Sequence, residues 1–330
     1  MKMRAFRRSL KTLGAVLLTA GTLTALKPAV SFAAYSYPSA AKYTAGDAEI
    51  KKPVRNLDVD WVSGQITVAY HSADTVELHE TSKKQISKDM QMRWWLDGDT
   101  LRVRYAKPGF HTLFARNKQL TITLPEDIVF DEVSMTTTSA DFLIPALQTD
   151  TLKLHVISGD IEAAADAQNA AVRANSGDLD LHFGGKAREI TAETTSGEIG
   201  LEAAAAERLS AASASGKIEL RAERVDELQA SSASGSISAE VGRVKRAALS
   251  TTSGNADVAF DRFDALSISA TSGNVRADLP EEPGFTASLK AGSGHIKSDL
   301  PLTKEGKVWT CGSGSSEVSI ATGSGNITLR

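Results

Sequence analysis

The sequence predicts an all-β protein, a single-stack parallel β-solenoid (β-helix) of about nine to ten 19-residue turns with an N-terminal β-rich capping region. The first observation is a Ser-Gly pair that recurs about every 19 residues until a shorter final step, and a fixed period of this length is typical of repeat architectures. A degenerate copy, Ser139-Ala140-Asp141, stands one period before the first full one. The serines are Ser158, Ser176, Ser196, Ser215, Ser234, Ser253, Ser272, Ser293, Ser313 and Ser324.

The second observation is an alternation of apolar and polar residues on both sides of each Ser-Gly pair. Positions six, four and two before the serine, and three, five and seven after it, are apolar or small in nearly every copy. The inward positions two before and three after the serine are five residues apart, and this odd number interrupts the alternation. The interruption indicates two strands joined by a corner. A turn of this length is too short for a strand-helix-strand crossover, so successive turns stack in parallel. The column three after the serine contains Ile161, Leu179, Ile199, Ile218, Ile237, Ala256, Val275 and Ile296.

Residues 1–33 have the form of a secretory signal peptide. Basic residues come first, Leu13 to Leu26 form an apolar run, and Ser31-Phe32-Ala33 supplies small residues before a cleavage site. The alternative is an uncleaved N-terminal anchor, although the run is shorter than the ~20 residues that span a bilayer. No later stretch could span one. We therefore expect a secreted or cell-envelope-associated protein.

Charge and cysteine content exclude several classes of function. The 330 residues carry a formal net charge of −3, and removing residues 1–33 takes away six basic residues and no acids, which leaves −9. An acidic exported chain has little reason to bind nucleic acid. The single Cys311 allows no intrachain disulfide. We expect it to be a small buried hydrophobe at an inward repeat position, rather than a catalytic thiol.

Four regions follow in order. Residues 34–52 are expected to form a linker after the signal peptide of residues 1–33, residues 53–130 an N-terminal β-rich cap with the first turns, and residues 131–330 the Ser-Gly solenoid. In the cap, Asp97-Gly98-Asp99-Thr100 predicts a hairpin, and Leu124-Pro125 ends the last strand. The shortened final step, Val318 to Arg330, is expected to close the opposite end of the solenoid.

These marks resemble a bacterial putative-adhesin family of unknown function with β-strand repeats. They are the exported N-terminus, the β-rich region ending at Leu124-Pro125, and the tetrapeptides beginning at Ser158, Ser176 and Ser196, which read S-G-D-I, S-G-D-L and S-G-E-I. The resemblance covers about residues 48–330 and implies an envelope-associated β-helix. It supplies no catalytic residues.

The residue after each Ser-Gly pair stacks on its counterpart in the next turn, near the ~4.8 Å strand spacing. Asp141, Asp160, Asp178 and Glu198 would form an acidic column. A bound Ca²⁺ would relieve the repulsion between these carboxylates. Alternatively, each carboxylate caps amides of the turn, or Asp160 and Asp178 act as a glycosidase pair. The sequence indicates no cofactor apart from this calcium ion.

One outward face is flat, uncharged and rich in small hydroxyl side chains. Such a surface suits contact with a polysaccharide or another sheet, because little side-chain entropy is lost on contact. The alternative is that small residues merely suit a tightly stacked sheet. The candidate ligand-binding residues are Ser210, Ala212, Ser231, Ser250, Thr252, Ser269 and Thr271.

The cap concentrates bulky side chains, namely Trp94, Trp95, Phe110 and Phe114. They serve either to cover the open edge of the solenoid or to bind a partner or sugar. Two functions follow for the whole chain. One is a non-enzymatic, monomeric, adhesin-like binding or structural module whose partner is an envelope polysaccharide or envelope protein. The other is a polysaccharide-acting hydrolase or lyase on a β-helix scaffold.

Overall fold

The structure is a computed structural model that describes residues 35–109 and 117–330. Residues 34–330 form one compact unit. The predicted signal peptide, residues 1–33, lies outside the described residues, as do Phe110 and Phe114. In the part of the chain that is described, the secondary structure is β apart from one short 3-10 helix.

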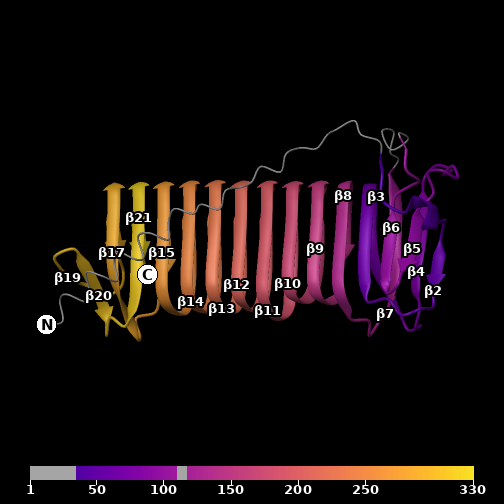
Figure 1. Ribbon diagram of the computed structural model, residues 1–330. Coiled ribbons are helices and arrows are strands. Elements are labelled where there is room, and N and C mark those ends of the chain that lie inside the picture. Colours follow the sequence, from indigo (N-terminus) through magenta and orange to yellow (C-terminus); the bar gives the residue numbers. More distant parts are fainter. Residues whose placement is uncertain (1–34, 110–116) are drawn as a thin grey trace. The chain divides into compact units, whose positions relative to one another are not determined.

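The central turns form the predicted parallel β-solenoid. The strands between residues 161 and 272 each begin just after one Ser-Gly corner and end at the serine of the next (Figure 1). The turn before them is divided at residues 145–147 into two strands. Neighbouring strands pair in parallel with corner opposite corner, so Ser158 pairs with Ser176, and Ser176 with Ser196. These strands are β8 (Phe130–Ile144), β9 (Gln148–Ser158), β10 (Ile161–Ser176), β11 (Leu179–Ser196), β12 (Ile199–Ser215), β13 (Ile218–Ser234), β14 (Ile237–Ser253) and β15 (Ala256–Ser272).

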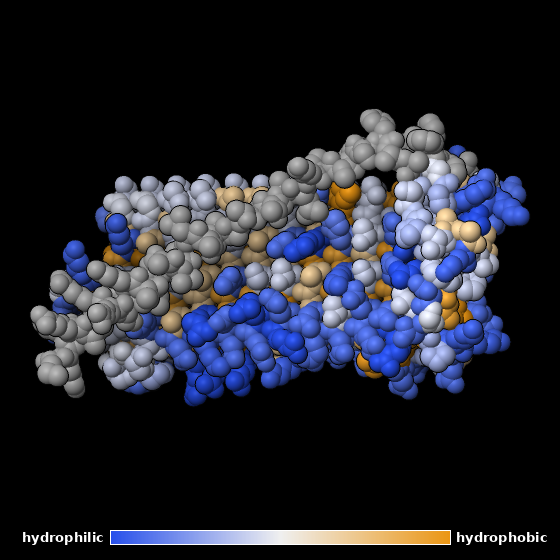
Figure 2. All heavy atoms as spheres, viewed as in Figure 1, coloured by the Kyte–Doolittle hydropathy of each residue, from blue (hydrophilic) through white to orange (hydrophobic). Residues whose placement is uncertain are grey.

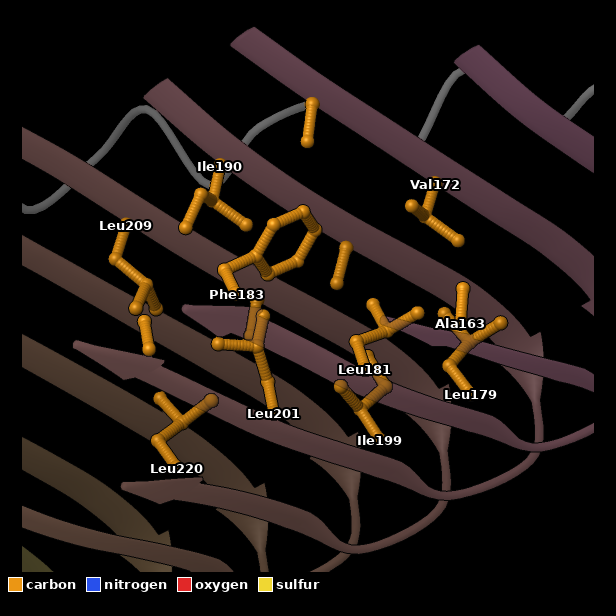
Figure 3. Packing of buried hydrophobic residues seen from close by; sticks show 14 of the residues in the cluster. Ala163, Val172, Leu179, Leu181, Phe183, Ile190, Ile199, Leu201, Leu209 and Leu220 are labelled. Atoms are coloured by element: carbon orange, nitrogen blue, oxygen red, sulfur yellow. The ribbon is translucent and has the colours of Figure 1, made fainter. Parts of the chain in front are cut away.

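The core is a set of aliphatic columns between the two walls of the coil. Ile161, Leu179, Ile199 and Ile218 are in register and at most 1% exposed. Figure 3 shows side chains from both halves of the turns pointing into the space between the walls. Burying one such side chain contributes roughly 1.5–3 kcal/mol, so the columns are the main source of stability in a chain without a disulfide.

Differences in repeat length are absorbed at the ends of the turns opposite the corners, which we call the far edge. It comprises residues 184–189, 204–208, 223–227, 242–246 and 261–265. Register shifts occur there between β10 and β11 and between β11 and β12. These strands belong to a shorter repeat, from Ser158 to Ser176, and a longer one, from Ser176 to Ser196. The corners therefore stay aligned while the far edge varies.

The N-terminal region caps one end of the solenoid. Strand β3 contributes a complete turn with its own corner at Ser63-Gly64, and it lies between β8 on one side and β6 and β7 on the other. Antiparallel strands then cover the edges of β6 and β7. The elements are η2 (Ala40–Lys42), β1 (Thr44–Ala45), β2 (Ala48–Ile50), β3 (Asn56–His71), β4 (Val76–Ser82), β5 (Arg93–Asp97), β6 (Thr100–Arg104) and β7 (Lys118–Pro125).

Two expected boundaries differ from the structure. Residues 34–52 were expected to be a linker, but from Tyr35 onward they contact the cap, where β1 pairs with β5 and β2 pairs with β4. The boundary between the regions 53–130 and 131–330 runs through a continuous sheet, since β3 pairs with β8 over residues 56–67. Residues 34–330 are one unit because the repeat pattern already begins in β3.

The C-terminal turn lies inside the stack rather than at its end. Strand β21 pairs with β15 on one side and β17 on the other, and β22 lies likewise between β16 and β18 (Figure 1). Our expectation that Val318–Arg330 closes the end is therefore wrong, and Ser313 belongs to the connection before β21 rather than to a corner. These strands are β16 (Val275–Asp278), β17 (Gly284–Ser293), β18 (Ile296–Ser298), β19 (Thr303–Glu305), β20 (Val308–Gly312), β21 (Ser316–Ser324) and β22 (Ile327–Leu329).

Candidate functional site

The Ser-Gly corners bring successive backbones into close contact. Gly216 has φ +158, and an ideal Cβ placed on it would lie 1.8 Å from the carbonyl oxygen of Gly197 in the neighbouring turn. No side chain fits at that distance. Glycine is therefore favoured at this position both by the close contact between turns and by the dihedral angle.

Inward hydroxyl groups donate hydrogen bonds to the carbonyl oxygens of this glycine column. Thr194 Oγ1 donates to Gly177 at 3.3 Å, and Thr251 Oγ1 donates to Gly235 at 3.1 Å. These contacts were not among the features predicted from the sequence, although the position two before the serine is often Ser or Thr. Cys311 does not belong to this column, because it lies on β20 opposite Phe285. It is buried as expected, and burial raises the pKa of its thiol.

The acidic column caps amides of the next turn. Oδ1 of Asp141 accepts a hydrogen bond from the amide of Asp160 at 3.0 Å, and Oδ1 of Asp160 accepts one from Asp178 at 2.9 Å. Asp178 does the same for the amide of Glu198 at 2.8 Å. One oxygen of each aspartate is therefore committed to holding the stack together.

After Lys217 and Ser236, the same column continues with asparagines. Asn255 accepts from the amide of Asn274, Asn274 from that of Asn326, and Asn326 from that of His295, each at 2.9 Å. The capping hydrogen bond thus needs a short side-chain acceptor and not a negative charge, and the turn with Lys217 in this position stacks without one. Asp160 and Asp178 hold equivalent hydrogen bonds, so the geometry assigns neither of them to the role of acid or base.

The calcium site at Asp141, Asp160, Asp178 and Glu198 stays a prediction. Within residues 35–109 and 117–330, no group of three or more His, Cys, Asp or Glu side chains is arranged to hold a metal ion. A cation at this column would have to bind to the aspartate oxygens that are not engaged by amides.

The seven residues of the predicted flat face lie on one wall of the coil, across β12 to β15. Ala212, Ser231, Ser250 and Ser269 are directly in register. A second in-register column, from Ser210 through Gln229 and Ala248 to Ser267, lies beside them. Thr252 and Thr271 lie next to the corner, each one residue before its serine. Figure 2 shows this wall as pale, with weakly polar and weakly apolar side chains.

The face is longer than the sequence indicates and has charged limits. Because β21 pairs with β15, Ser319 and Ala321 continue the two columns. Beyond them Lys290 of β17 follows, and at the opposite limit Glu193 of β11 pairs with Arg173 at 3.0 Å. The uncharged surface therefore extends over β12, β13, β14, β15 and β21.

The far edge carries a ladder of charged side chains. In one column the signs alternate along the stack, from Glu189 through Arg208 and Glu227 to Arg246. Arg208 Nη2 lies 3.0 Å from Glu227, and Arg246 also pairs with Glu227. Hydrogen bonds from the two arginines lower the pKa of Glu227. Figure 2 shows this band of strongly hydrophilic residues below β10 to β14.

The cap encloses a buried ion pair. Lys118 is opposite Gly64, and its ammonium pairs with Glu80, their side chains being 1% and 3% exposed. It also donates to the carbonyl oxygen of Met90 at 2.7 Å and lies over the rings of Trp61 and Tyr105. Burial lowers the pKa of Lys118 to about 8, against the opposing effect of Glu80.

Tyrosines at the start of the described chain bind the cap. Tyr35 donates to the carbonyl oxygen of Asp60 at 3.2 Å, and Tyr37 donates to that of Ala106 at 3.0 Å. Tyr43 packs on Trp95 with ring centroids 5.6 Å apart, whereas Trp94 packs against the core. The two tryptophans thus have structural partners in the cap.

The family model for Toastrack DUF4097 matches residues 54–241 and, in an overlapping second match, residues 166–330. Together these cover most of the chain. It belongs to the Toastrack DUF4097 family. The repeated match of one model within this Toastrack chain agrees with its internal repeats, and the resemblance to an adhesin-like family of unknown function is confirmed.

Similar solved structures include a putative cell adhesion protein from Clostridium sporogenes ATCC 15579, with 11% identity, a TM-score of 0.25, and coverage of 87% of this chain and 99% of that one. A putative lipid binding protein from Parabacteroides distasonis ATCC 8503 has 14% identity, a TM-score of 0.43 and coverage of 86% and 96%. A putative adhesin from Bacteroides fragilis NCTC 9343 has 12% identity and a TM-score of 0.32. The match covers 87% of this chain and 97% of that one. No curated protein matches the Toastrack chain.

In the described part of this Toastrack chain, no helix has the length and apolar character needed to cross a membrane.

Proposed function

We propose that this Toastrack chain is a non-enzymatic binding module of the cell envelope, exported by the signal peptide of residues 1–33. It acts as a monomer. Its partner is an envelope polysaccharide or an envelope protein, which lies against the flat face defined by Ser210, Ala212, Ser231, Ser250, Thr252, Ser269 and Thr271.

The observation that carries this proposal is the in-register face itself. Ala212, Ser231, Ser250 and Ser269 repeat at the strand spacing on a wall that is held rigid by buried aliphatic columns and by the hydrogen bonds of the corners. Short side chains lose little conformational entropy on contact. A wall of this kind suits an extended, regularly repeating partner better than a small molecule, since it offers no enclosed cavity of its own.

Lysine substitutions test the face. Ala212→Lys, Ser231→Lys and Ser250→Lys, singly and together, are compared with Ser238→Lys, which lies on the other wall of β14 between Glu219 and Asp257. Binding is measured on a glycan array and by cosedimentation with peptidoglycan sacculi. We expect the triple variant to lose binding and Ser238→Lys to retain it. Equal binding by all variants would show that the flat face does not bind the partner.

The alternative, a polysaccharide-acting enzyme, predicts release of reducing sugar from a bound glycan. Asp160 and Asp178 are the carboxylates that it would use. Binding without release supports the binding module, whereas turnover that disappears in Asp160→Asn or Asp178→Asn would establish the enzyme instead.

A further inference from the structure

The far edge contains a row of three arginines with the same charge. Arg224, Arg243 and Arg262 are in register on β13, β14 and β15, and all three are exposed. Successive members stand one strand apart, about 4.8 Å. In the described part of the chain, none of the three forms an ion pair at 4.0 Å or less.

The neighbouring charges on the same edge are arranged differently. The column from Glu189 to Arg246 alternates in sign, and Lys245 pairs with Asp226 at 2.8 Å. Like charges directly opposite each other destabilise a sheet, and the alternating column avoids that cost. The arginine row does not avoid it. An anion bound along the row would supply the missing partners.

Arg243 differs from the other two arginines in the residue that precedes it. Glu223 and Asp261 precede Arg224 and Arg262 in the chain, but the equivalent position before Arg243 is Gly242. The far-edge segment of that turn, Gly242 to Arg246, contains no acidic residue, and of its three basic residues Lys245 and Arg246 are paired with Asp226 and Glu227 of the preceding turn. Within the described residues, Arg243 is the basic residue of this segment that is left without an ion pair.

The row ends beside a pocket of about 590 Å³. The pocket forms where the far edge is interrupted, because the next strand in the stack, β21, begins only at Ser316, whose hydroxyl donates to the carbonyl oxygen of Phe263 at 2.7 Å. Its polar and charged lining comes from Arg243, Arg262, Asp264, Glu282, Ser315 and Ser316. Pro280 and Pro283 add apolar surface.

This lining fits a sugar that carries an acidic group. Guanidinium groups bind carboxylates through paired, charge-assisted hydrogen bonds. Carboxylates accept hydrogen bonds from hydroxyl groups, which a sugar supplies and a simple inorganic anion does not. The acidic balance of the chain also opposes non-specific attraction to polyanions.

We propose that Arg224, Arg243 and Arg262, with the adjoining pocket, bind an acidic polysaccharide that runs along the solenoid, its carboxylates on the arginines and its hydroxyl groups on Asp264 and Glu282. This assigns a second binding surface, on a different part of the coil from the flat face, and so goes beyond the function proposed above.

The test measures binding of oligogalacturonate to the full chain by isothermal titration calorimetry. Arg243→Gln removes a guanidinium from the row, and Arg246→Gln is the matched control, since it lies in the same turn, has the same change in charge and is paired with Glu227 in the alternating column. We expect Arg243→Gln to weaken binding about tenfold. Arg246→Gln should weaken it by less than about twofold.

Three results would overturn the proposal. These are no binding of oligogalacturonate by the unmodified chain, equal losses in the two variants, or binding of polyphosphate at least as tight as that of oligogalacturonate, which would indicate general attraction to anions. The triple lysine variant of the flat face should bind oligogalacturonate unchanged. Failure of the flat-face proposal and failure of this one are therefore separable.

Discussion

The carbonyl oxygen of Gly159 occupies the space that a side chain on Gly177 would need, since an ideal Cβ on Gly177 would lie 1.9 Å from that oxygen. The φ of Gly177 is +143, which L residues rarely adopt. Both restrictions act at the same corner, and the close contact recurs at successive turns, including those of Gly235 and Gly254, which lack the restrictive positive φ. The glycine thus allows the close approach of the two turns at this corner, whereas the degenerate corner of β8 has Ala140 in the equivalent position.

Gly177→Ala should lower the free energy of unfolding by about 3 kcal/mol or more, because the methyl group forces the turns apart and strains the backbone. The control is Gly98→Ala in the β5–β6 hairpin, which also has a positive φ, 67, but open space around its Cβ position. Its cost should be about 1 kcal/mol. Urea denaturation compares the two, and equal losses would show that contact between turns adds nothing.

Asp160→Asn should leave the stability nearly unchanged, because Asn255 and Asn274 perform the same capping at equivalent corners. Asp160→Ala should cost about 1 kcal/mol, since the amide of Asp178 loses its acceptor. Thermal melting of both variants tests this. Repeating the melts with calcium tests the metal prediction, since a cation bound to the acidic column would raise the Tm of the unmodified chain more than that of Asp160→Asn.

The stability of the cap should depend on pH through Asp60. Burial raises the pKa of Asp60 from 3.8 to about 6, with Arg104 lowering it and Asp58 raising it. A folded-state pKa above the unfolded value means that Asp60 favours folding fully below about pH 4, and that this contribution is lost as the pH rises to about 6. Relative to the unmodified chain, Asp60→Asn should therefore gain roughly 1 to 3 kcal/mol between pH 4 and pH 7. A difference that stays constant from pH 3 to pH 8 would contradict this.

Lys118→Met should destabilise the cap by roughly 3–5 kcal/mol, because Glu80 would keep a buried charge without its partner. Adding Glu80→Gln to Lys118→Met should recover a large part of the loss. Tryptophan fluorescence during denaturation follows the change, since the ammonium lies over the ring of Trp61. If the double variant is no more stable than Lys118→Met, the unpaired carboxylate is not the cause.

The sequence was sufficient to predict the solenoid because each column of the repeat has one physical role. The same template fits earlier copies that we did not use. Leu57, Val59 and Trp61 lie six, four and two residues before Ser63, and Ile66 lies three after it. Leu120, Ile122 and Leu124 have the corresponding spacing from Asn117. Alignment on these positions would have placed β3 and β7 in the stack.

Other features were beyond the reach of the pattern. The turns that contain Ser293 and Ser324 match the repeat equally well, so nothing in their residues states which of them packs on β15. Likewise, the hydrophobic pattern predicts that residue 118 lies at a corner. It does not predict that the side chain of Lys118 points inward and pairs with Glu80. The flat face was predicted residue by residue, because facing outward follows directly from the period of 2, but its extension through Ser319 depended on the order of the strands.

The placement of β21 and β22 within the stack has a consequence for biosynthesis. Strands β21 and β22 are translated after β17 and β18, so β17 and β18 cannot reach their final neighbours until the residues of β22 have been made. This end of the coil therefore assembles by insertion of β21 and β22 between strands that were made earlier. It also means that the short strand β22 is held on both sides, by β16 and by β18.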